Sequence, residues 1–188
     1  MGVTTKRRAK TIEQFAIVVC MLLCLAANTL ADAAPQPLVQ VDVPPSFGPR
    51  PLEDQTRDAV VRDYLKCWKT MSQALQENNL SVLDSAFTGI AKEKLAGVIS
   101  QQQKANLTTS YRDGSHHLRF VFYSPEGLSI QLLDDAEYDV EVSDRGKTQA
   151  MRHVKARYVA VLTPTEVSWK VRILQADAGV EDNVTAKR

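Results

Sequence analysis

The sequence predicts an α+β domain, in which three helices are followed by an antiparallel sheet of about five strands. Between residues 54 and 105, apolar residues recur at spacings of three and four, which places them on one face of a helix. Between residues 118 and 173, apolar and polar residues alternate in short runs separated by turn residues, as in strands with one buried face. Because the helices come first and the strands follow without interleaving, the strands are expected to pair antiparallel.

The helical part divides into three segments. The first helix is predicted from about Asp54 to Glu77, and Asn78-Asn79 is its stop signal. Its apolar stripe consists of Val61, Tyr64, Leu65, Trp68, Met71 and Leu75. A short second helix, capped by Ser81, is expected to end at Thr88-Gly89. The third helix is predicted from about Ala91 to Ala105. Its inward residues are expected to be Leu95, Val98 and Ile99.

The sheet is predicted from five alternating runs, and Asp134-Asp135 is interpreted as a break between two of them. The residues expected to point inward are Leu118, Phe120, Phe122, Leu128, Ile130, Leu132, Tyr138, Val140, Val142, Val154, Ala156, Tyr158, Ala160, Leu162, Trp169, Val171 and Ile173. That set contains no carboxylate and no imidazole. A general base must come within ~3 Å of the proton that it removes, so this face argues against proton-transfer chemistry between sheet and helices.

Residues 1–33 have the order of a targeting segment. A basic cluster, Lys6–Lys10, precedes an apolar run of 13 residues, Phe15–Ala27, and the small residues Ala31 and Ala33 follow. This order is typical of a secretory signal peptide, here cleaved after about Ala33. The run is shorter than the ~20 residues that a membrane-spanning helix needs. We therefore predict export to the periplasm or the exterior; the alternative is a single-pass anchor that holds the C-terminal domain outside the cytoplasm.

The predicted domain comprises residues 54–176, and a linker and a tail are predicted on either side of it. Residues 34–53 hold six of the eight prolines, which favours an extended, semi-rigid linker without a helix or a central strand. Residues 177–188 are expected to be a flexible tail.

The order of these elements resembles the nuclear transport factor 2-like superfamily over about residues 55–176. The resemblance depends on Trp68, on Asn79-Leu80-Ser81-Val82-Leu83, on Phe87-Thr88-Gly89 and on the closing run Ser168-Trp169-Lys170-Val171. It is nearest to the domain shared by mitochondrial inner-membrane import proteins and plastid-division proteins. It implies a curved sheet that wraps the helices into a cone. Because the superfamily spans isomerases, dehydratases, ligand binders and non-catalytic adaptors, the resemblance leaves the function open.

Three other features bear on chemistry. His116 and His117 are adjacent and point to opposite faces of a strand, so they cannot chelate one ion, and neither a metal nor another cofactor is predicted. Cys67 is expected to be a small apolar residue on the first helix, with dimerisation or a redox role as alternatives. Glycosylation-type sequons begin at Asn79, Asn106 and Asn183; turn chemistry also explains asparagine at these places.

The outward register carries an acidic row, Glu137, Asp139 and Glu141, and a mainly basic row on the next run. If the hairpin closes with Glu141 opposite His153, Asp139 faces Lys155 and Glu137 faces Arg157. Such pairs set the register of a sheet at ~0.2–1 kcal/mol each. The alternative is a protein-docking face, expected to consist of His153, Lys155, Arg157, Lys170 and Arg172.

The function predicted from these observations is a non-catalytic interaction module, exported or membrane-tethered, whose partner is another protein, membrane-associated or a second copy of the chain. Of 23 basic and 22 acidic residues, four and two precede Ala34, which leaves a domain with a net charge of −1 and no general attraction to nucleic acid. The second hypothesis is a binder of a small apolar ligand inside the cone, lined by Tyr64, Trp68, Tyr138, Tyr158 and Trp169. An isomerase or hydratase is the third.

Overall fold

The computed structural model of the chain describes residues 36–45 and 48–177. The predicted signal peptide, its cleavage site, and residues 178–188 with Asn183 lie outside these ranges. No helix of the described ranges is both long enough and apolar enough to cross a membrane.

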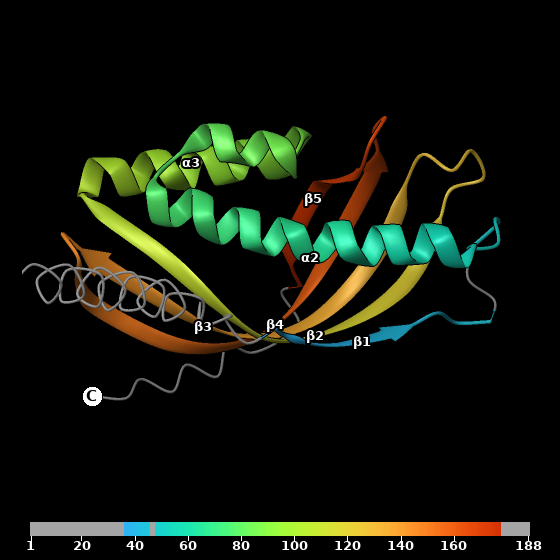
Figure 1. Cartoon of the computed structure of the whole chain (residues 1–188), viewed down its shortest axis with the longest axis horizontal. Helices are drawn as coiled ribbons and strands as arrows, with labels where there is room; N and C mark the ends of the chain where they lie inside the picture. The colour runs from blue at the N-terminus through green and yellow to red at the C-terminus, as the bar shows by residue number, and fades with distance from the viewer. Residues whose placement is uncertain (1–35, 46–47, 178–188) are drawn as a thin grey trace, which may run out of the picture. The chain divides into compact units, whose positions relative to one another are not determined.

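Within these described ranges, a five-stranded open sheet forms one layer, with strand order β1-β2-β3-β4-β5 (Figure 1). The strands are β1 (Leu38–Asp42), β2 (Leu107–Tyr123), β3 (Ile130–Asp144), β4 (Lys147–Pro164) and β5 (Trp169–Ala176). The pairs from β2 to β5 are antiparallel, as the sequence predicts. β1 lies in the segment expected to be a linker and pairs parallel to β2, which makes the sheet mixed. This placement is compatible with the prolines around β1 because it is an edge strand.

The first helix, α2 (Asp54–Glu77), has the predicted bounds. Its end is a left-handed Asn78, which tolerates positive φ better than most residues. A 3-10 turn, η2 (Leu80–Ser85), follows, and the side chain of Asn79 caps it by accepting a hydrogen bond from the Ser81 N–H. The prediction that Ser81 itself is the cap is therefore wrong by two residues.

The third helix, α3 (Gly89–Ala105), begins two residues earlier than predicted. Ile99 is fully buried and Leu95 is partly buried, but Val98 is 45% exposed, so its predicted inward position is wrong. A short loop between η2 and α3 joins the helical layer to the sheet, because the Thr88 N–H donates to Val171 O and the Val171 N–H donates to Ala86 O.

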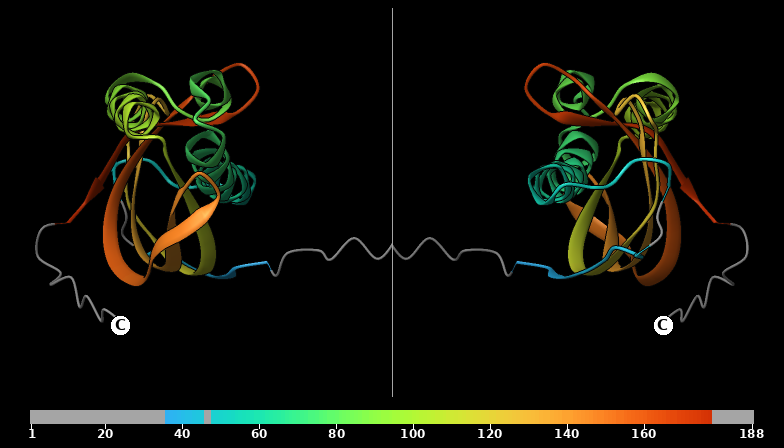
Figure 2. Two further views of the ribbon diagram at one scale, coloured as in Figure 1. Left: turned by 90° about the vertical axis from the view of Figure 1, so that its left-hand side faces the viewer. Right: turned by 90° about the vertical axis from the view of Figure 1, so that its right-hand side faces the viewer.

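All three described helical segments lie on one side of the sheet, which curves around α2 (Figure 2). The apolar core forms between them. Its largest fully buried side chains include Trp68, Tyr64, Phe87, Phe120 and Leu75. The opposite face of the sheet has no described helix over it (Figures 1 and 2).

Predictions about the strands are wrong at several positions, each for a local reason. The runs expected on either side of Asp134 form a single strand, β3, that continues through it. A bulge between Phe120 and Phe122 reverses the facing, so that Phe122 is 39% exposed and Tyr123 is buried. Leu128 is in the turn before β3 and is 62% exposed.

Candidate functional site

A cluster of three polar side chains is buried between α2 and the sheet. The Tyr64 hydroxyl donates to Asp134 Oδ2 at 2.8 Å, and His116 Nδ1 donates to the same oxygen at 2.8 Å. Relative exposure is 0% for Tyr64, 2% for His116 and 0% for Asp134. The cluster connects the middle of α2 to the neighbouring strands β2 and β3. Along the chain, Asp134 is 70 residues from Tyr64 and 18 residues from His116.

This cluster overturns the prediction that the inner face of the sheet has no carboxylate or imidazole. Asp134 has the same parity as Ile130 and Leu132, and the burial pattern of β3 alternates without a break from Ile130 to Tyr138. His116 shares its parity with Leu118, which is also buried. The alternation in the sequence contained this signal. The run that starts at Leu118 reaches His116 when it is extended by two residues toward its N-terminus, and the run that ends at Leu132 reaches Asp134 when it is extended by two residues toward its C-terminus.

Aromatic rings enclose the cluster. The Trp68 ring lies 5.0 Å from that of His116, 5.2 Å from that of Tyr138 and 5.3 Å from that of Tyr158, measured between centroids. The hydroxyls of Tyr138 and Tyr158 are hydrogen-bonded to each other. Four of the five residues expected to line a ligand pocket are thus together, and they pack against one another.

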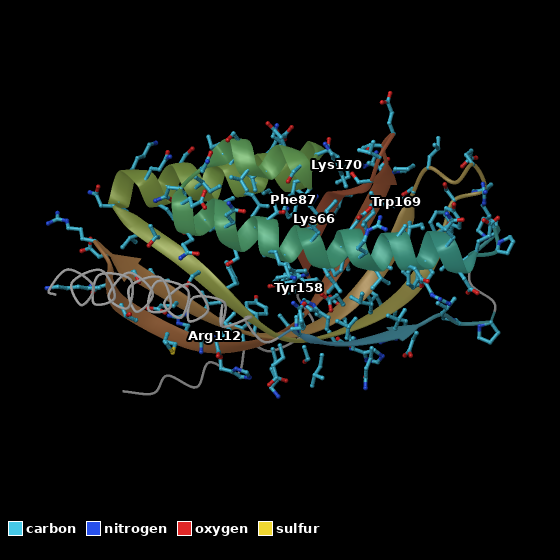
Figure 3. The ribbon with its side chains drawn as sticks, viewed as in Figure 1. Lys66, Phe87, Arg112, Tyr158, Trp169 and Lys170 are labelled. Atoms are coloured by element: carbon cyan, nitrogen blue, oxygen red, sulfur yellow. The ribbon has the colours of Figure 1, made fainter. Side chains whose placement is uncertain are left out.

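Trp169, the fifth predicted lining residue, lies elsewhere. It packs edge-on against Tyr123 at 6.4 Å between centroids, near the start of β5. Figure 3 shows Tyr158 beneath α2 and Trp169 toward the other end of the sheet. The backbone N–H of Trp169 donates to Asp63 Oδ2 at 2.8 Å, and Asp63 is buried on α2.

The buried environment determines the electrostatics of the cluster. Burial, together with the nearby Asp134 charge, raises the pKa of the Tyr64 hydroxyl well above its usual value of 10.0, so Tyr64 remains a hydrogen-bond donor. Cys67, one turn further along α2, is also buried, and burial raises the pKa of its thiol to about 12. A thiol with this pKa is a poor nucleophile at neutral pH, in agreement with the prediction of a small apolar residue.

The outer face of the sheet carries the predicted charge pairs in a shifted register. His153 is opposite Asp139, Lys155 is opposite Glu137 and Arg157 is opposite Asp135, two residues from the predicted pairing. Because the shift is an even number of residues, every side chain keeps its predicted face. The hairpin turns at Arg145 and Gly146, both with positive φ, and a bulge after Val142 completes the offset.

These pairs are close. His153 Nδ1 is 2.8 Å from Asp139 Oδ1 and His153 Nε2 is 2.8 Å from Glu137 Oε1, while Lys155 Nζ is 2.9 Å from Glu137 Oε2. Arg157 binds Asp135 through two nitrogens, at 2.6 and 3.2 Å. The hydrogen bond to Asp139, with a further one to Glu137, raises the pKa of His153 above 6.5. Hydrogen bonds from Lys155 and His153 lower the pKa of Glu137.

The five residues expected to form a docking face are divided into two groups. His153, Lys155 and Arg157 lie on the arm of β4 beyond the end of β5. Lys170 pairs opposite Thr163, which is eight residues, or roughly 26 Å, further along β4 than Lys155. The Nζ of Lys170 donates to Asp84 O in η2. Arg172 lies beside Gly89 at the start of α3. Figure 3 shows Lys170 next to the helices and Arg112 on the other side of the sheet.

A shallow cleft of about 330 Å³ opens on the outer face where β1 begins beside β2. Its lining includes Leu38, Arg112, Gly114, Glu137, Asp139 and His153. Gly114 is part of a second β2 bulge, and a Cβ at this position would come within 2.8 Å of Glu137 O. The absence of that side chain lets β2 approach β3 closely beside the cleft.

The two adjacent histidines point to opposite faces, as predicted. His116 belongs to the buried cluster, whereas His117 on the outer side pairs with Asp42 of β1 at 2.7 Å. Within residues 36–45 and 48–177, no group of three or more histidine, cysteine, aspartate or glutamate residues is arranged to hold a metal ion.

Comparison with known proteins supports the fold alone. No protein-family model matches the chain, and no curated protein does. Among solved structures, the chain is similar to the intermembrane space region of the chloroplast protein ARC6, with a TM-score of 0.53 and 15% identity. The match covers 68% of this chain and 98% of that one. A chloroplast protein of similar fold agrees with the resemblance to plastid-division proteins inferred from the sequence.

Proposed function

We propose that this chain is an exported interaction module, without catalytic activity, that binds a partner protein through the outer face of its sheet. The observation that carries the proposal is the contrast between the two faces. The inner face is closed by α2 and by its own aromatic side chains, whereas the outer face has no described helix over it and carries charged side chains and a cleft.

The closed interior is the reason for placing ligand binding second to docking. Tyr64, Trp68 and Tyr138 are 5% exposed or less and contact one another or the same neighbours. Aromatic side chains packed in this way supply core stability through ~150–250 Å² of buried area each. The fold shared with the ARC6 intermembrane space region is consistent with an extracytoplasmic module, and the N-terminal segment provides the export signal.

Site-specific photocrosslinking tests the docking face. A photoreactive amino acid replaces Arg112 in the cleft, and a control replaces Ile90, which is 52% exposed on α3. The full chain is expressed in its own cells, and adducts are identified by mass spectrometry. We expect one discrete adduct from position 112 and none from position 90. An equal yield from both positions, or no adduct from the cleft, contradicts the proposal.

The same cells test the location. We expect the mature chain to begin near Ala34 and to fractionate outside the cytoplasm, with the membrane fraction supporting the anchored alternative. A chain that retains Met1 and remains in the cytosol contradicts export.

A proton-transfer enzyme of the isomerase or hydratase type is the third candidate, and it is retained because Asp134 and His116 are titratable groups on the inner face. A substrate reaches them only if α2 moves away from the sheet, since both side chains are 1% exposed or less. Binding of an apolar probe such as 8-anilinonaphthalene-1-sulfonate to the native chain, with a shift of the His116 NMR signals, favours this candidate. No binding favours the docking module.

A further inference from the structure

Among the described residues, one edge of the sheet has no neighbouring strand over much of its length. β5 pairs with β4 only from Tyr158 to Pro164, and the Asp177 N–H donates to Arg157 O at 2.7 Å where the pairing ends. From Lys147 to Ala156, β4 has β3 on one side and no described strand on the other. We call residues 147–156 the open edge.

The backbone of the open edge presents a regular set of donors and acceptors. In a strand, successive residues direct their N–H and C=O groups to alternate sides. Arg157 O points toward β5, so the same groups of Lys155, His153 and Met151 point in that direction, away from β3. On the opposite edge of the sheet, a helix side chain satisfies backbone groups of β2. Ser72 of α2 accepts a hydrogen bond from the N–H of Tyr111 and donates one to its C=O. The open edge has no such cover among the described residues.

Four of the ten residues of the open edge are basic, and none is acidic. Lys147, Arg152, His153 and Lys155 lie on it, and no acidic residue occurs between Arg145 and Thr165. The carboxylates that pair with His153 and Lys155 belong to β3. A strand added beside β4 would lie ~4.8 Å from these basic residues and about twice as far from the β3 carboxylates, close to the screening length of physiological salt.

This distribution of charge selects the kind of strand that can be added. A second copy of the chain would bring another basic strand against the edge, and like charges directly opposite are destabilising. Lysine and arginine on an edge also oppose uncontrolled self-pairing. A strand rich in glutamate or aspartate satisfies the backbone groups and the basic side chains together.

We propose that the open edge of β4 takes up an extended acidic segment of the partner protein as an added strand of the sheet. Strand addition gives affinity through main-chain hydrogen bonds and specificity through alternate side chains. This inference rests on the proposed docking function and names the chemistry of the partner. The open edge is ten residues long, which is enough for a partner strand of the usual length of about five residues.

Amide hydrogen exchange measured by NMR on the full chain tests the inference. The probe is a peptide of about ten residues that alternates glutamate with valine, and the control peptide has lysine in place of glutamate. We expect the acidic peptide to slow exchange of the amides of Met151, His153 and Lys155 and the basic peptide to leave them unchanged. Equal effects of the two peptides, or no protection by the acidic one, overturn the inference.

Substitutions separate backbone pairing from simple charge attraction. Met151→Pro removes one edge donor and should weaken binding of the acidic peptide about fivefold or more, whereas Met151→Thr keeps the donor and should not. Because proline can prevent folding, Arg152→Glu provides a second variant, with Lys94→Glu on α3 as its matched control. Arg152→Glu should weaken binding and Lys94→Glu should not; equal effects overturn the inference.

Other occupants of the open edge give distinct results. Protection of the three amides that grows with protein concentration, without peptide, assigns the edge to a second copy. Protection that disappears only when residues 178–188 are deleted assigns it to the chain's own C-terminal residues, which include Glu181 and Asp182. Either result overturns the inference. A crosslink from position 112 without peptide protection leaves the docking function in place and removes strand addition alone.

Discussion

Replacement of Asp134 by leucine tests whether the buried polar cluster holds α2 on the sheet. The leucine removes the acceptor of two hydrogen bonds, from the Tyr64 hydroxyl and from His116 Nδ1. Each buried donor that loses its acceptor costs ~1–3 kcal/mol. The expected loss from the two donors is therefore ~2–6 kcal/mol of unfolding free energy, a large fraction of the ~5–15 kcal/mol that stabilises an ordinary domain.

A double-mutant cycle with Tyr64→Phe isolates the Tyr64–Asp134 contact from the change in packing. Tyr64→Phe alone deletes the hydroxyl at an expected cost of ~1–3 kcal/mol, and in its presence Asp134→Leu no longer leaves that hydroxyl without an acceptor. We expect a coupling free energy of ~1–3 kcal/mol, measured by urea unfolding followed by circular dichroism. Additivity within ~0.5 kcal/mol would show that the two side chains do not interact, and the reasoning about the cluster would be refuted.

Three further predictions concern the outer face, the buried thiol and the hairpin. The pKa of His153, measured by NMR titration, should lie above 6.5 and should fall in Glu137→Gln, while an unchanged pKa contradicts the pairing with Glu137. In a variant without the two cysteines of residues 1–33, the Cys67 thiol should react with 5,5′-dithiobis(2-nitrobenzoic acid) only after unfolding, and rapid reaction of the native chain contradicts its burial. Arg145→Asn should raise the unfolding free energy by about 0.5–1 kcal/mol, because asparagine tolerates the positive φ of the turn better than arginine; a loss of stability contradicts the turn geometry.

The charge pairs of the outer face have a defined pH window. The folded pKa of His153 is raised, so its contribution is fully present below about pH 6.5 and is lost as the pH rises through the folded pKa. The folded pKa of Glu137 is lowered, so its contribution is present above about pH 4.5 and is lost as the pH falls through the folded pKa. Both contributions are therefore complete between about pH 4.5 and 6.5.

The bulges show why the inner face could be predicted only in part. Alternation in β3 was readable on both sides of Asp134, but an Asp-Asp pair is typical of a turn, and only the register with β2 and β4 carries the strand through it. Phe122 and Leu128 were assigned by the same alternation and are exposed, because one bulge and one turn reverse their facing. No local pattern marks such irregularities, since the neighbouring strand determines them.

The sequence by itself determined the features that depend on near neighbours: the bounds of α2, the change from helix to strand period, and the opposite facing of His116 and His117. These follow from backbone geometry within a few residues. Only the tertiary structure decided the parallel position of β1, the enclosure of Asp134 by α2, and the open edge of β4. Each of these features depends on which distant segments come into contact. Tyr64 and Asp134, for example, are 70 residues apart, and their hydrogen bond forms only when the core is folded.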